Sequence, residues 1–386
     1  MAWYWQVVNR CCKKIRIAYH PSMEHASVRG RRCHLRESLR WSAARATSLV
    51  EILAAALGLA VPVAVGAAVG HLAPGLVAAV GGLLINDVVP GPTVGVHARR
   101  LAVVLAPALI ATLASMLTSG ALGDVLVVGL ATAAALVGGY SRGLAVAAMR
   151  FVLALVLTSH AAESIAVNPV GMLALVALGA LTAALISVGL AALPFGAWRA
   201  TEVASAPGPA AAATPAQKYA RWKRMLRQRA GWQYPLRLGG SLAVAAVLRA
   251  AWPAHHFHWI ALVVAILTER ENTPLPIKTT QRALGTLAGV IAAGVLVVYQ
   301  PTAWGLVIAV AVLGGLRPLL KARSYVAYTA AITPLIVLLM SAARPLGIGV
   351  LLDRLVATLL GAALVIGANV LTAWWLGDAR RGTPAG

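Results

Sequence analysis

Twelve stretches of mostly apolar residues follow one another between about residue 46 and residue 375, and short polar segments separate them. An apolar helix of about 20 residues crosses a hydrocarbon core of about 30 Å. Some stretches are short or contain Pro62, Pro107 or Pro334, which membrane helices tolerate where neighbouring helices satisfy the freed backbone groups. The pattern predicts an all-α membrane protein with about twelve transmembrane helices, at roughly 46–69, 72–86, 100–118, 121–138, 143–160, 169–192, 236–252, 258–268, 279–299, 303–315, 324–340 and 349–373.

The composition and the charge distribution agree with this prediction. Hydrophobic residues make up 60% of the chain and charged residues 11%, whereas soluble proteins carry about 25% charged residues. The net charge is +22, but the basic residues cluster between the apolar stretches, as the positive-inside rule requires. With both termini in the cytoplasm, 28 of the 33 basic residues fall in cytoplasmic segments, among them 269–282 and 316–323. We therefore expect cytoplasmic N and C termini and no nucleic-acid partner.

The twelve stretches form two sets of six that read as repeats of one unit. The third stretch of each set opens in a similar way, with ARRLAVVLAP around Arg100 and TQRALGTLAG around Arg282. Between the sets, the basic sequence KYARWKRMLRQR is typical of a helix on the lipid surface. The predicted organisation is a basic N-terminal segment, a first membrane half, a cytoplasmic linker, a second membrane half and a tail, at 1–45, 46–193, 194–234, 235–376 and 377–386.

A shorter motif occurs twice within the second half. Its two copies are Arg282-x-x-Gly285-Thr286-x-x-Gly289 and Arg354-x-x-Ala357-Thr358-x-x-Gly361. The first copy lies on a helix that leaves the cytoplasm and the second on one that returns, as inverted three-helix repeats require. Two interpretations stay open. The glycines allow close helix packing while Arg282 reaches the interface, or Arg282 and the Thr286 hydroxyl line a polar path for an anion, because the guanidinium fork matches a carboxylate.

Charged residues within membrane helices are costly and are functional candidates by default. The candidates are Glu51, Arg150, Arg237, Arg249, Asp353 and Arg354, with Glu269 at the inner end of the eighth stretch. Ion pairs between helices, or anchoring at an interface, are the alternative for each of them. Glu269, Asp353 and Glu51 are the candidates for proton coupling, because desolvation raises the pKa of a carboxyl group.

The sequence HHFHW places His255, His256 and His258 in an outer loop next to Trp259. Imidazole suits zinc or copper, but no carboxylate or thiol lies nearby in the sequence, so a structural role is favoured and no metal is expected. Trp259 suits either an aromatic belt at the membrane surface or a surface on which an aromatic solute stacks.

The second half resembles the fusaric acid resistance protein-like family, which is related to bacterial aromatic acid exporters. The resemblance covers about 140 residues and is most specific in the segment from Trp259 to Gly289, which includes ALVVAILTERENTPLPIKTTQRALGTLAG. In the first half, Val103, Val104 and Pro107 replace the Gly, Thr and Gly of the motif, so that half resembles a diverged copy. Longer family members carry a soluble domain between their halves, where this chain has a linker of about 40 residues. The resemblance implies export of aromatic acids.

The sequence contains no phosphate-binding loop and no His-Glu-x-x-His motif, so neither an enzyme nor a cofactor is predicted. Our first hypothesis is a multi-pass transporter of the bacterial inner membrane that exports small organic anions by alternating access, coupled to the proton gradient. A passive anion channel and a non-transporting scaffold for an envelope partner are the alternatives. Membrane lipid is an expected partner, and a homodimer stays open. The residues expected to contact the substrate are Arg282, Thr286, Arg150, Trp259, Arg237, Arg354 and Thr358.

Overall fold

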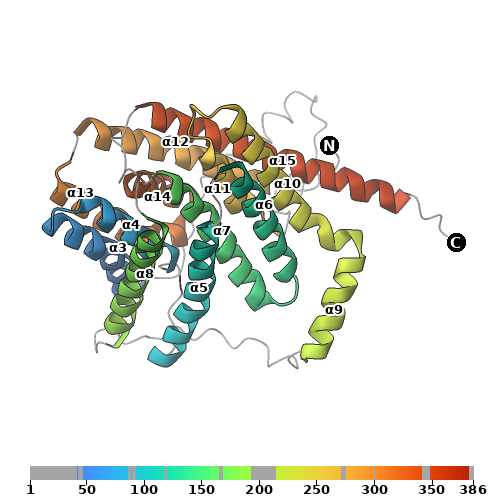
Figure 1. The fold of residues 1–386 in the computed structure, drawn as a ribbon, viewed down its shortest axis with the longest axis horizontal. Helices are drawn as coiled ribbons and strands as arrows, with labels where there is room; N and C mark the ends of the chain where they lie inside the picture. Colours follow the sequence, from blue (N-terminus) through green and yellow to red (C-terminus); the bar gives the residue numbers. More distant parts are fainter. Residues whose placement is uncertain are drawn as a thin grey trace, which may run out of the picture.

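In a computed structural model of the chain, the described residues are Trp41, Val88 and the ranges 47–85, 93–116, 120–164, 168–192, 214–270, 275–299, 301–340 and 348–381. Within these ranges the chain forms thirteen helices and no strand (Figure 1). The helices are α3 (Leu49–Ala68), α4 (Leu72–Ile85), α5 (Val94–Ser115), α6 (Gly120–Val137), α7 (Arg142–Ser164), α8 (Pro169–Ala192), α9 (Pro215–Arg227), α10 (Arg229–Ala251), α11 (His258–Leu267), α12 (Leu275–Tyr299), α13 (Ala303–Arg323), α14 (Tyr325–Met340) and α15 (Ile348–Arg381).

Each of the twelve predicted stretches coincides with a helix, which confirms the all-helical prediction. Six helices, α3, α5, α7, α8, α13 and α15, are long and apolar enough to cross a membrane. Helices α4, α6, α11 and α14 include shorter apolar stretches of 10–17 residues. The prediction placed 316–323 in a cytoplasmic loop, but α13 continues to Arg323. The linker helix is also present, as α9, while the predicted N-terminal segment 1–45 lies almost wholly outside the described residues.

The helices pack in the same pairs within each half. In the first half, α3 contacts α4 and α8, α4 contacts α8, α5 contacts α7 and α8, and α6 contacts α7. In the second half, α10 contacts α11 and α15, α11 contacts α15, α12 contacts α14 and α15, and α13 contacts α14. The contacts between the halves are reciprocal as well: α3 packs on α13 and α10 on α6, while α4 meets α14 and α11 meets α7.

Glycine allows the closest of these approaches. A Cβ atom placed on Gly179 of α8 would lie 1.7 Å from the Ala78 carbonyl oxygen of α4, and one on Gly314 of α13 would lie 2.8 Å from the Leu59 side chain of α3. A single cluster of buried apolar side chains extends through both halves, from Leu59 to Val365. The two halves therefore share one core.

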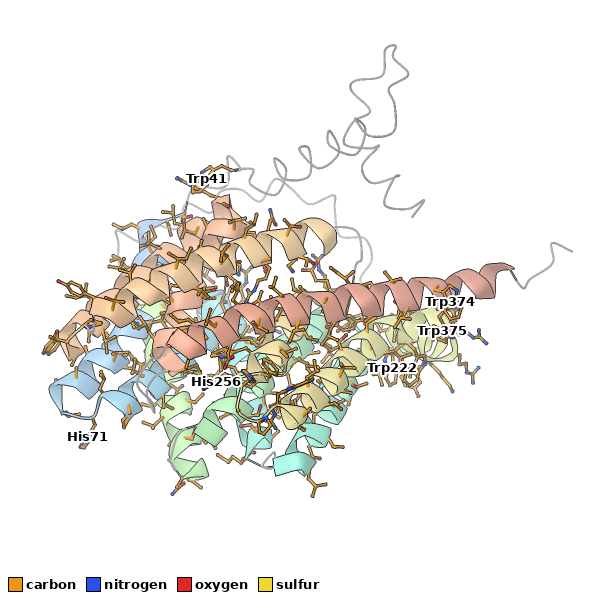
Figure 2. The ribbon with its side chains drawn as sticks, turned by 90° about the horizontal axis from the view of Figure 1, so that it is seen from above. Trp41, His71, Trp222, His256, Trp374 and Trp375 are labelled. Carbon is orange, nitrogen blue, oxygen red and sulfur yellow. The ribbon has the colours of Figure 1, made fainter. Side chains whose placement is uncertain are left out.

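Helix α9 lies against the end of α6. The Thr214 hydroxyl and the Gln217 side chain form a capping box at its N-terminus. The Trp222 indole N–H donates to the Leu136 carbonyl at 3.0 Å, and its ring meets Tyr140 edge-on. Figure 2 labels Trp222 on α9 and Trp374 and Trp375 on the C-terminal part of α15. The aromatic residues of the linker thus attach α9 to the helical body.

Candidate functional site

The two copies of the arginine motif come together in the second half. Helices α12 and α15 pack side by side (Figures 1 and 2), and Arg282 and Arg354 lie close enough for their positive charges to repel each other. The exposed fraction of the side chain is 2% for Arg282 and 0% for Arg354. These side chains do not reach a surface, so the alternative in which they anchor the helices at a membrane interface is not observed.

Most of the nitrogen atoms in this arginine pair have no hydrogen-bond acceptor in the described part of the chain. The atoms without an acceptor are Nε and Nη2 of Arg282 and all three guanidinium nitrogens of Arg354. An unpaired buried ion costs several kcal/mol of stability even after the protein relaxes, and two like charges cost more. The pair is therefore a concentration of buried positive charge without a counter-charge among the described residues.

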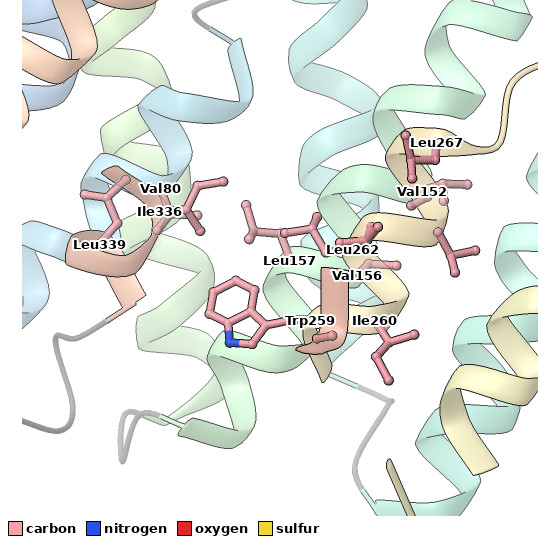
Figure 3. Packing of buried hydrophobic residues seen from close by; sticks show 14 of the residues in the cluster. Val80, Val152, Val156, Leu157, Trp259, Ile260, Leu262, Leu267, Ile336 and Leu339 are labelled. Carbon is pink, nitrogen blue, oxygen red and sulfur yellow. The ribbon is translucent and has the colours of Figure 1, made fainter. Parts of the chain in front are cut away.

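Trp259 supports the arginine pair from α11. The guanidinium carbon of Arg354 lies 3.9 Å from the centroid of the Trp259 ring, within the range of a cation–π contact. The indole is 3% exposed and belongs to the shared apolar core. Figure 3 shows it near Leu157 and Leu262. Neither belt-like exposure nor a free stacking face is observed, since Arg354 covers the ring.

Threonine and glycine residues complete the surroundings of Arg282. The hydroxyl groups of Thr286 and Thr329 are buried and have no partner among the described atoms. Gly285 and Gly289 face α14, where an added Cβ would lie 2.6 Å from the Cβ atoms of Thr329 and Thr333 respectively. The small residues let α14 approach α12, so that polar groups from both helices lie in one buried region.

The second motif copy uses its small residues differently. The Thr358 hydroxyl donates to the Arg354 carbonyl of its own helix at 2.9 Å. A Cβ atom on Gly361 would lie 2.8 Å from the Val263 side chain of α11. This close approach of α15 to α11 is what brings Arg354 onto Trp259.

Asp353, the neighbour of Arg354, is held by the histidine loop. Its two carboxylate oxygens lie 2.9 Å from Nδ1 of His255 and Nδ1 of His256, and the His256 backbone N–H donates to the same carboxylate at 2.9 Å. Figure 2 shows His256 beside the first turns of α15. The carboxylate that the sequence next to these histidines lacks is thus supplied by α15, 98 residues after His255 along the chain. Among the described side chains, no group is arranged to hold a metal ion.

A second polar cluster joins the end of α11 to α10 and α15. Arg237 donates to the Asn369 side chain, to the Glu269 carbonyl at 2.9 Å and to the Gln233 carbonyl at 3.3 Å. The Glu269 carboxylate forms an ion pair with Lys278. All three side-chain nitrogens of Arg237 thus donate to groups of the protein.

Arg270, in the loop that follows α11, extends this polar cluster towards the first half. Its guanidinium lies over the Tyr234 ring at 4.7 Å and donates to the Ala135 carbonyl at 2.8 Å. Burial lowers the pKa of Arg270, and the Tyr234 hydroxyl opposes that shift. The loop is therefore attached to both α10 and α6.

The other candidates lie away from the arginine pair. Arg150 is half-buried on α7, and Glu51 lies in the first turn of α3, so both belong to first-half helices. Arg249 forms an ion pair with Asp124 of α6 at 2.6 Å, in the wall of a cavity of about 40 Å³. Asp124 was not among the predicted candidates, although it lies inside the predicted stretch 121–138.

These features define a multi-pass helical membrane protein with a buried arginine pair in its second half. Residues 242–368 match the model of a family described as fusaric acid resistance protein-like, which confirms the resemblance expected from the sequence. The match includes Trp259, Arg282 and Arg354, and it implies a transporter-like role in the membrane. Comparisons with curated proteins and with solved structures give no match.

Proposed function

We propose that this protein is a secondary transporter that exports small organic anions, with aromatic carboxylates as the substrate class, across the bacterial inner membrane. The observation that carries the proposal is the buried pair Arg282 and Arg354, whose guanidinium nitrogens lack acceptors in the described chain. A carboxylate supplies two oxygens that match one guanidinium fork. The direction of transport and the aromatic character come from the family resemblance.

We propose further that the halves are repeats of one six-helix unit. A shift of 182 residues, the separation between Arg100 and Arg282, places each helix of the first half over a helix of the second. The recurring helix pairs within and between the halves support this duplication. At the position equivalent to Arg354 the first half has Met172, which is buried among apolar residues. The anion site then belongs to the second half alone.

Alternating access in transporters of repeated architecture arises when one repeat moves against the other around a central site. In this chain, the moving surfaces would be the contacts between α3 and α13 and between α10 and α6. Both termini lie in the cytoplasm in this proposal, because that orientation satisfies the positive-inside rule.

For coupling to the proton gradient, we favour Asp353 over Glu269 and Glu51. Asp353 directly precedes Arg354, and its carboxylate contacts the imidazoles of both His255 and His256. Glu269 is paired with Lys278, and Glu51 lies on the first-half helix α3. Movement of a proton in the histidine–aspartate cluster would change the charge next to the site.

The test is flux of labelled benzoate into liposomes that contain the purified protein, with and without an imposed pH gradient. Gradient-driven accumulation by wild type that is lost in Arg282→Gln and Arg354→Gln supports the proposal. Arg100→Gln is the matched control, because Arg100 is exposed on the equivalent helix α5. Flux that only equilibrates, with or without the gradient, would indicate a channel. Absence of flux for every anion would leave the non-transporting scaffold as the remaining hypothesis.

A further inference from the structure

The arginine pair carries more positive charge than one carboxylate neutralises. Arg282 and Arg354 are both buried, and neither has an ion pair in the described part of the chain. The carboxylate nearest in sequence, Asp353, is already engaged by His255 and His256. Among the described residues, the region therefore holds two buried positive charges and no counter-charge.

The guanidinium nitrogens that lack an acceptor form two separate edges, one on each arginine. Nε and Nη2 of Arg282 are adjacent nitrogens whose N–H groups point the same way, so together they fit the two oxygens of one carboxylate. The guanidinium carbon of Arg354 lies over the Trp259 ring, and its nitrogens are available to a second acidic group. All three of its nitrogens lack an acceptor among the described residues.

A monoanion at this site would leave one buried positive charge without a partner, which is strongly destabilising in a low-dielectric interior. A dianion with two separated acidic groups would neutralise both guanidinium groups and use both edges. We propose, on the basis of the proposed function, that the preferred ligand is a dicarboxylate. One carboxylate would bind Arg282 and the other Arg354.

The proposal predicts a specific order of affinities in the purified, detergent-solubilised full chain. The ligands are benzoate, phthalate, isophthalate and terephthalate, titrated by calorimetry near pH 7.5, where all their carboxyl groups are ionised. The three dicarboxylates differ only in the distance between their acidic groups, so they also measure the spacing of the two edges. We expect the best dicarboxylate to bind at least about tenfold more tightly than benzoate, the value of one additional charge-assisted contact.

Single substitutions separate the role of each arginine. In Arg282→Gln and Arg354→Gln one guanidinium remains, so benzoate still binds, which also shows that the variant is folded. The dicarboxylate preference should fall to less than about threefold, because only one charge-assisted contact is left. Arg282→Lys and Arg354→Lys keep the double positive charge and should keep a clear preference. The surface variant Arg100→Gln should behave as wild type.

Three results would overturn the proposal. Equal affinity of wild type for benzoate and for the best dicarboxylate would show that the site does not prefer a dianion. The proposed anion transport would not be affected by that result. Loss of the preference in the lysine variants as complete as in the glutamine variants would show that charge is not its cause. Retention of the full preference in either glutamine variant would show that the second carboxylate binds elsewhere. If none of the four ligands binds wild type, the proposed function itself fails.

Discussion

The guanidinium group of Arg354 lies over the indole of Trp259, with 3.9 Å between the guanidinium carbon and the ring centroid. The two residues come from α15 and α11, which are separated by α12, α13 and α14 along the chain. A desolvated cation–π contact contributes about 2 kcal/mol. Trp259 therefore supports a buried arginine whose nitrogens are available to an anion.

Substitution of Trp259 tests this support. Trp259→Leu removes the ring and should weaken benzoate binding by about tenfold, which corresponds to about 1.4 kcal/mol of the cation–π contact. Trp259→Phe keeps a ring that makes a weaker cation–π contact, so its benzoate affinity should fall between those of wild type and Trp259→Leu. Calorimetric titration measures the affinities, and Trp304→Leu is the control, because Trp304 is 56% exposed on α13. Unchanged affinity in Trp259→Leu would show that the contact has no part in binding.

Arg354→Met should make the ligand-free protein more stable. It replaces a buried charge that has no partner among the described residues with the residue at position 172, its counterpart in the proposed repeat. Apolar replacement of buried ionic groups can gain about 1–4 kcal/mol. We expect a higher unfolding temperature in detergent than wild type shows, while the stabilisation that added benzoate gives is reduced but retained, because Arg282 remains.

The control for this stability effect is Arg249→Met. Arg249 forms a hydrogen-bonded ion pair with Asp124, so its removal should not raise the unfolding temperature. A lower unfolding temperature for Arg354→Met would mean that Arg354 stabilises the fold, and it would contradict the assignment of the charge to ligand binding.

Gly285 and Gly294 lie on the same helix and should respond oppositely to alanine. At Gly285 the new Cβ would lie 2.6 Å from the Thr329 Cβ and from the Val326 carbonyl oxygen, so overpacking should cost about 1–3 kcal/mol. At Gly294 the nearest atom lies 3.8 Å away, and alanine should gain about 0.5–1 kcal/mol from its helix propensity. Unfolding in detergent measures both, and equal effects would contradict the close approach of α12 to α14.

Asp353→Asn should separate coupling from binding. The substitution removes the titratable carboxylate but leaves both arginines, so we expect binding of benzoate to persist while accumulation driven by the pH gradient is lost. Asp124→Asn, at the α6–α10 ion pair, is the matched carboxylate control. Liposome flux measures the outcome. Undiminished gradient-driven accumulation by Asp353→Asn would assign coupling to another group.

The sequence predicted the helices well because each apolar stretch is read locally. The Arg282 and Arg354 motifs were also visible, since their residues recur at helical spacing. Residue types and spacing alone did not reveal that the two arginines are buried together. That arrangement depends on how α12 packs against α15, which is a tertiary property.

Two other features show the same limit of local reasoning. The contact of Asp353 with His255 joins residues that are 98 positions apart, so the histidines read as having no carboxylate nearby. Arg317 reads as a basic loop residue near the end of an apolar stretch, yet α13 extends past it and its side chain is buried. Charge counts along the chain assign such a residue to the wrong environment.

The most direct test of the central claim is a structure of the protein with 4-iodobenzoate, in which anomalous scattering locates the iodine atom. The account predicts carboxylate density at the unpaired guanidinium edges of Arg282 or Arg354, with the iodine within the reach of one benzoate ring, and no such density in a double Arg282→Gln, Arg354→Gln variant. An iodine peak elsewhere in the molecule, with the two guanidinium groups unoccupied at saturating ligand, would contradict it.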